Sequence, residues 1–133
     1  MRAYFTKAKG TGILATADKA GKVDVAIYAR PYVIDPKTVA FVMAENRSYA
    51  NVCENPKAAY LFLEETQGYA GKRLYLTKTK EERDPARVKK LREDLAKDFG
   101  RAYCPADEVG TAFIVYFRVD AIRVLIGDAE EKP

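Results

Sequence analysis

The chain has 133 residues, of which 48% are hydrophobic and 32% are charged, and its formal net charge is +4. This length supports one well-packed core and is too short for two ordinary domains, so we expect a single domain over residues 1–133. The composition is that of a globular protein, and no apolar run is long enough to span a bilayer. The N-terminus lacks the apolar stretch of a secretory signal, which favours a cytoplasmic protein without membrane contact.

The chain contains no histidine and has two cysteines, Cys53 and Cys104. Without histidine, zinc sites, haem held by His, and Ser-His or Cys-His catalysis are all disfavoured, so we expect no metal site. Cys53 lies in a predicted helix and is expected to be a small buried side chain, whereas Cys104 is expected to be exposed. A reduced pair is favoured in a chain without a secretion signal.

The positive charge is modest and lies partly in one predicted helix, which carries Lys89, Lys90 and Arg92. Glu93 and Asp94 follow on the same helix, whose other face is apolar. A nucleic-acid footprint would be more basic and more clustered than this. The pattern therefore favours a solvated helix face, and we expect no nucleic-acid partner.

The chain begins with a predicted short helix over residues 2–9, a strand over 12–17 and a polar turn at 18–22. A return strand over 23–33 then alternates apolar and polar side chains. The face expected to join the core comprises Val23, Val25, Ile27 and Ala29. The face expected to carry the chemistry comprises Asp24, Ala26, Tyr28 and Arg30. Pro31 cannot donate to a strand ladder, so pairing is expected to loosen just after Arg30.

The sharpest chemical feature is the corner after the apolar strand predicted at 39–44. Asn46 is a plausible helix cap, and Arg47 and Ser48 fall in the first turn of the helix that follows. The unpaired backbone N–H groups of a helix start, together with these two side chains, could hold a phosphate. An ordinary corner with a solvated arginine is the alternative, and the local pattern alone favours it.

Further elements follow the stop signal at Asn55 and Pro56. Strands are predicted at 57–64, 72–79 and 111–119, with an acidic, frayed tail at 127–133. Residues 120–126 either extend the last strand or pair with it. An amphipathic helix starts at Asp84-Pro85, its apolar face formed by Val88, Leu91, Leu95 and Phe99, and residues 101–110 form a loop. Six or seven strands in hairpin-like succession favour a mainly β fold, a closed or partly closed antiparallel barrel with flanking helices.

Three segments carry a resemblance to a known family. They are GILATADKAGKVDVAIYARPYV, AFVMAENRSYANVCENPKAAYLFLE and GKRLYLTKTKEE, within about residues 5–80. The order of elements and these residues resemble the split-barrel FMN-binding family related to pyridoxine/pyridoxamine 5'-phosphate oxidase. The resemblance implies a six-stranded antiparallel Greek-key split β-barrel, FMN as cofactor, and a homodimer with the cofactor at the subunit interface.

The resemblance also implies a set of cofactor-binding residues. Arg47 and Ser48 match the phosphate grip, supported by Arg30 and backbone amides. The second strand, with Tyr28, Ala29 and Arg30, would line the flavin, and the backbone of the central strand at Val42 and Met43 would face its isoalloxazine ring. The remaining matches are Asn51, one turn beyond the phosphate grip, and Arg73 on an adjoining strand. The aromatic residues of 60–62 and 113–117 either form the subunit interface or fill the barrel.

Two functions stay open at this point. One is a flavin-dependent oxidoreductase that acts on a small acceptor, or an electron-transfer protein, in which the flavin carries the difficult step. The other is a non-enzymatic module that binds or senses flavin or another phosphorylated ligand. A nucleic-acid-binding barrel is suggested only by the basic balance and the aromatic strands. The sequence indicates no catalytic side chain and no particular electron donor or acceptor.

Overall fold

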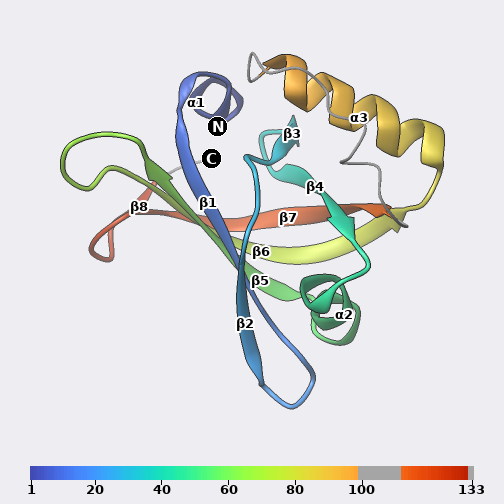
Figure 1. Cartoon of the computed structure of the whole chain (residues 1–133). Helices are drawn as coiled ribbons and strands as arrows, with labels where there is room; N and C mark the ends of the chain where they lie inside the picture. The colour runs from blue at the N-terminus through green and yellow to red at the C-terminus, as the bar shows by residue number, and fades with distance from the viewer. Residues whose placement is uncertain (99–111, 132–133) are drawn as a thin grey trace.

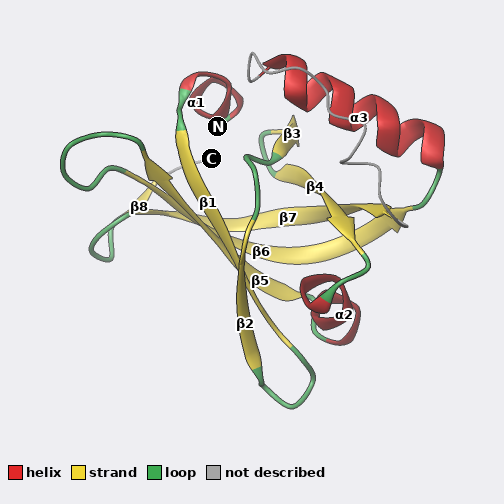
Figure 2. Ribbon diagram, viewed as in Figure 1, coloured by secondary structure: helices red, strands yellow, loops and turns green. Residues whose placement is uncertain are grey.

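The computed structural model describes residues 1–98 and 112–131. The predictions for Phe99, Cys104 and the loop 101–110, and for the side chain of Leu95, lie outside the described residues. The helices are α1 (Arg2–Lys7), α2 (Arg47–Glu54) and α3 (Pro85–Asp98). The strands are β1 (Gly10–Ala17), β2 (Val23–Ile27), β3 (Tyr32–Asp35), β4 (Thr38–Ala44), β5 (Lys57–Glu64), β6 (Gly71–Glu82), β7 (Ala112–Val124) and β8 (Glu130–Glu131). The mainly β fold class is confirmed (Figure 2).

The described strands form one antiparallel sheet in the order β2-β1-β5-β6-β7-β4-β3, with β8 paired to β7. The sheet curls strongly, so that β3 and β4 come to face β1 across the interior (Figure 1). Eight strands are present in the described residues where six were expected in the barrel. The predicted strand 23–33 is divided into β2 and β3, with Pro31 in the connection between them, where strand pairing was expected to loosen. Part of the tail that was predicted to be frayed forms β8.

One core fills the inside of the curled sheet. Its largest side chains come from five strands and are fully buried: Leu14, Met43, Tyr60, Phe62, Leu74 and Phe117. Helix α2 contacts β1, β2 and β4, and it therefore joins the two ends of the strand path (Figure 1). Helix α3 lies on the outside against β4 and β7, over a smaller apolar cluster that includes Val88, Leu91 and Ile114.

The prediction that Val23, Val25 and Ile27 face the core is wrong. The side chains of Val23, Val25 and Ile27 are 77%, 67% and 77% exposed. The cause is the register with β1, which places Ala26 opposite Leu14 and Asp24 opposite Thr16, both buried residues of β1. Directly opposed residues point to the same side of a sheet, so the valine and isoleucine stripe faces outward.

All but one of the aromatic side chains of β5 and β7 fill the barrel. Tyr60, Phe62 and Phe117 are completely buried and Phe113 is nearly so, whereas Tyr116 is buried on the outer face, in the cluster beneath α3. Of the two interpretations open from the sequence, packing inside the molecule is therefore the correct one. An interface with another subunit has to use other side chains.

Gly12 in β1 is packed directly against the segment that connects β2 to β3. The Tyr60 hydroxyl lies 3.1 Å from both the Tyr28 and the Ala29 carbonyl oxygens and donates to them. A Cβ at Gly12 would overlap the Tyr60 hydroxyl and the Tyr28 carbonyl. Any side chain at this position must therefore displace the connection.

We predict that Gly12→Ala destabilises the protein by about 1–3 kcal/mol, the usual cost of overpacking. Urea unfolding followed by circular dichroism measures the change. Thr11→Ala, at an exposed neighbour on the same strand, is the control and should unfold close to the wild type. Equal unfolding midpoints for Gly12→Ala and Thr11→Ala would contradict the packing described for Gly12.

Candidate functional site

The start of α2 is built by a side-chain cap. Asn46 is extended, and its Oδ1 accepts a hydrogen bond of 3.1 Å from the backbone N–H of Tyr49. The predicted cap is therefore confirmed. Arg47, the first helical residue, is exposed and carries its charge into solvent. A helix start with its positive end and an exposed arginine is a suitable place for an anion.

Tyr28 joins this corner from the connection after β2. Its hydroxyl lies 3.4 Å from Oδ1 and 3.3 Å from Nδ2 of Asn46, and its ring packs edge-on against Phe41 at 6.0 Å. The polar face predicted for 24–30 is thus brought to the helix start at Tyr28. The corner combines a phenol, a capping amide and the Arg47 guanidinium.

Two predicted site residues of α2 point inward instead. Ser48 is 2% exposed and Asn51 is 1% exposed. Asn51 Nδ2 donates to Thr16 Oγ1 at 3.0 Å, which fastens α2 to β1, and Asn51 Oδ1 has no hydrogen-bond partner in the described part of the chain. A ligand outside the helix cannot reach these side chains in this conformation, so Arg47 is the predicted α2 residue whose side chain is presented outward.

Arg30 and Ala29 contact other parts of the chain. Arg30 Nη1 donates to the carbonyl oxygens of Phe5, at 2.8 Å, and Ala8. It therefore fastens the end of α1 to the connection between β2 and β3. Ala29 contributes its carbonyl oxygen to the Tyr60 hydroxyl, and its side chain is exposed.

The remaining predicted residues lie in three different parts of the structure. Met43 is fully buried in the main core, whereas Val42 packs against the cluster beneath α3. Arg73 Nε donates to the Val124 carbonyl at 2.9 Å, and its Nη2 donates to Gly127. Arg73 lies five residues before Lys78, which contacts α2, so about 17 Å of strand separates them. The structure does not gather Met43, Val42 and Arg73 around the helix start.

Sequence reasoning missed a charged cluster on the side of α2 nearest β6. The Tyr49 ring stacks on Phe113 with centroids 4.1 Å apart, and its hydroxyl donates to Glu81. Lys78 Nζ lies 2.9 Å from Glu81 and 3.8 Å from Cys53 Sγ. Cys53 is exposed, which corrects its predicted burial, because the outer side of α2 faces solvent. No local sequence pattern indicates this cluster, because pairing between segments that are distant in the sequence brings its residues together.

Neither of two hollows beside β3 coincides with this corner. One, of about 250 Å³, lies beneath α3, and another, of about 540 Å³, lies between α1 and the turn after β3. None of the predicted site residues lines either hollow. In the described ranges, three or more His, Cys, Asp or Glu side chains nowhere gather closely enough to hold a metal ion. No helix of the described chain combines the length and apolarity needed to cross a membrane.

Comparison with known proteins identifies the fold but no sequence family. No protein-family model matches the chain, and no curated protein matches it in sequence. Among solved structures, an FMN-binding protein from Syntrophomonas wolfei subsp. wolfei matches with a TM-score of 0.76 at 15% identity, over 96% of this chain and 85% of that chain. A candidate pyridoxamine 5'-phosphate oxidase from Listeria innocua matches with a TM-score of 0.64 at 15% identity, over 92% and 94%.

Proteins described with other cofactors share the same fold. HutZ, a heme storage protein from Vibrio cholerae, matches with a TM-score of 0.68 at 17% identity, over 92% of this chain and 90% of that chain. An F420 reductase also matches. The fold that the sequence resemblance implied is therefore confirmed, and it is a fold found with more than one cofactor.

The stability of the protein at low pH should depend on the ionisation of Glu81. Burial alone raises the pKa of Glu81, but hydrogen bonds from Tyr49 and Lys78 outweigh it and hold this pKa below its ordinary value of 4.5. A carboxyl whose pKa is lowered by folding stabilises the protein above its unfolded pKa. That stabilisation is lost as the pH falls through the folded value.

We therefore predict that, as the pH is lowered, the free energy of unfolding falls less in Glu81→Gln than in the wild type. Urea titrations of both proteins at a series of pH values between about 6 and 3 measure this dependence. The wild-type curve should fall more steeply below about pH 4.5 than the variant curve. Parallel curves would show that the Glu81 hydrogen bonds do not form in solution.

Proposed function

We propose that this chain is an FMN-binding flavoprotein, with the phosphate of FMN held at the start of α2. The observation that carries the proposal is the exposed corner of Asn46, Arg47 and Tyr28, where a capped helix start and a guanidinium face solvent together. The fold shared with an FMN-binding protein supports it. Arg47 and the first backbone amides of α2 would bind the phosphate, because Ser48 and Asn51 direct their side chains inward.

The outer face of the sheet supports a homodimer. The register between β2, β1 and β5 aligns apolar side chains on that face in two rows: Ile27, Ile13 and Leu61, and Val25, Ala15 and Ala59. The β2 residues of these rows are among the most exposed large hydrophobic side chains described. An exposed apolar patch of this kind marks a contact surface. We infer that a second copy covers it and that FMN lies at the subunit interface.

The chemistry of such a protein resides mainly in its cofactor. FMN, when bound, supplies electron or hydride transfer, while this chain's residues bind and orient it. This division fits a flavin-dependent oxidoreductase acting on a small acceptor, or an electron-transfer protein. We place the protein in the cytoplasm, where nicotinamide donors and small acceptors are found. The alternative is a module that binds flavin or another phosphorylated ligand without turnover.

Heme is a weaker candidate, although the fold is shared with a heme storage protein. The 133 residues include no histidine, so an imidazole cannot serve as the axial ligand to the iron. Met43, one alternative ligand type, is fully buried in the core. The side chains at the proposed corner suit a phosphate better than an iron porphyrin.

We predict that the purified protein binds FMN and that Arg47→Ala weakens this binding about 5- to 150-fold, the loss expected for a charge-assisted phosphate contact of about 1–3 kcal/mol. Quenching of flavin fluorescence during titration measures the dissociation constant. Lys89→Ala removes one positive charge from the exposed side of α3 and should leave it unchanged.

Absence of FMN uptake by the wild type would overturn the proposal, and equal affinity in Arg47→Ala would remove this residue from the site. Hemin and F420 titrated in parallel test the other cofactors found with this fold. Flavin bound to the protein can be reduced by a nicotinamide donor and then reoxidised by an acceptor. If no acceptor reoxidises it faster than oxygen alone, whichever donor is used, the result would favour the non-enzymatic module.

The proposed dimer makes a separate prediction. Ile27→Lys places a charge on the most exposed end of the apolar face and should convert the dimer into a monomer, because an unpaired charge is costly to bury. Sedimentation velocity measures the molecular mass. Ile126→Lys changes a residue of similar exposure, 68%, in the turn after β7, and should remain dimeric. A wild-type protein that sediments as a monomer would contradict the interface.

A further inference from the structure

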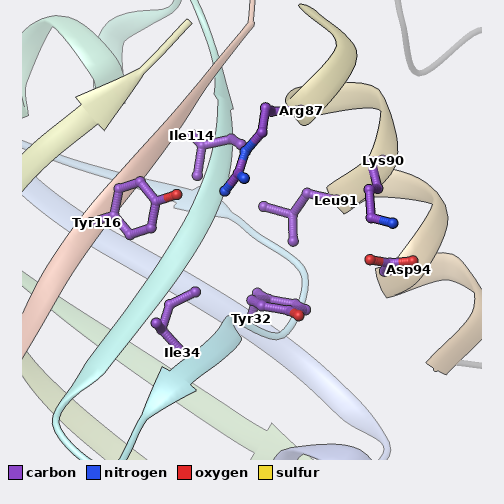
Figure 3. Close-up of a pocket in the computed structure, with 8 residues that line it drawn as sticks. All are labelled: Tyr32, Ile34, Arg87, Lys90, Leu91, Asp94, Ile114 and Tyr116. Atoms are coloured by element: carbon purple, nitrogen blue, oxygen red, sulfur yellow. The ribbon is translucent and has the colours of Figure 1, made fainter. Parts of the chain in front are cut away.

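A second candidate site lies beneath α3, away from the start of α2. It is a hollow of about 250 Å³ between α3 and the strands β3 and β7 (Figure 3). Its volume corresponds to about eight water molecules, at about 30 Å³ each, which is room for a small single-ring molecule. All of the side chains that define it belong to described residues.

The inner part of the hollow is apolar and aromatic. Leu91 of α3 and Ile114 of β7 are buried and line it, together with Ile34 of the edge strand β3. The rings of Tyr32 and Tyr116 stand on opposite sides of the space (Figure 3). Apolar walls with flanking aromatic rings favour a planar, apolar body in the occupant.

The rim carries one oriented cation. The Arg87 guanidinium reaches over the space towards the Tyr116 hydroxyl (Figure 3). Glu82 positions both groups, since its Oε1 lies 3.4 Å from Arg87 Nε and its Oε2 accepts a 2.9 Å hydrogen bond from the Tyr116 hydroxyl. Arg87 also forms a side-chain hydrogen bond with Tyr116, so Glu82 and Tyr116 hold the guanidinium at the rim and its remaining N–H groups can donate to an anionic group.

The charge balance around the rim decides which anion fits. Arg87 and Lys90 contribute two positive charges, Asp94 and Glu82 contribute two negative ones, and Lys80, 4.7 Å from the centre of the Tyr116 ring, adds a third positive charge. Surroundings with a single net positive charge give a dianionic phosphate little advantage over a monoanion. A carboxylate matches the planar fork of a single guanidinium and carries one charge.

We propose that this hollow binds a small aromatic monocarboxylate, with its ring between Tyr32 and Tyr116 and its carboxylate on Arg87. The site is independent of the FMN corner, because it shares no residue with the start of α2. It adds a ligand class to the proposed flavoprotein, whether or not the cofactor is bound.

Benzoate is the probe that tests the site. In two-dimensional NMR titrations of the full chain, benzoate should bind saturably with a dissociation constant of about 1 mM or tighter, as expected for a ligand of this size. The shifted resonances should cluster at β3, β7 and α3. Benzamide, which has the same shape without the charge, should bind at least about fivefold more weakly, and phenyl phosphate should bind no better than benzoate.

Variants locate the binding. Arg87→Gln should weaken benzoate at least about tenfold, whereas Lys89→Gln, on the same helix but outside the hollow, should not. Ile34→Trp fills the space from an edge strand and should abolish binding, with circular dichroism confirming the fold. Benzoate that fails to bind at 10 mM (roughly ten times the expected constant), or that binds both variants like the wild type, overturns the proposal. Tighter binding of phenyl phosphate would replace the carboxylate with a phosphate ligand.

Discussion

The packing of α2 between the two ends of the sheet is the contact on which the rest of the structure depends. The helix buries Tyr49 and Val52 in the core and contacts β1, β2 and β4, so it holds together strands that lie far apart in the hydrogen-bonded order. The same orientation turns Ser48 and Asn51 inward and leaves Arg47 outside. One helix rotation thus determines both how the barrel is filled and which side chain is offered to a ligand.

Several arginine side chains hold distant segments of the chain together through hydrogen bonds to backbone carbonyl oxygens. Arg2 donates to the carbonyl oxygens of Val33 and Ile34 at 2.7 and 2.9 Å, which protects the edge strand β3 from pairing with another chain. Arg30 and Arg73 likewise donate to backbone carbonyls, at α1 and at the turn after β7. These fork-shaped donors satisfy carbonyl groups that strand pairing leaves over. Positive charge in the sequence is therefore a poor guide to anion sites in this fold.

The two faces of the sheet have different consequences. Inside, large aromatic side chains are packed between the strands. Outside, the small and branched side chains of β1, β2 and β5 form a surface that suits a second copy, while α3 covers the opposite end and encloses a separate hollow.

The sequence by itself determined the elements that depend on local interactions. The strands at 39–44 and 57–64, the Asn46 cap and the interruption around Pro31 follow from apolar runs, a capping amide and a missing N–H, and all were predictable. Only the tertiary structure decided which face of β2 is inside, because alternation shows that two faces differ but not which one meets the core. Tertiary structure likewise buried Ser48 and Asn51 and brought Arg87, Glu82 and Tyr116 together, since these positions follow from strand register and helix rotation between segments distant in the chain.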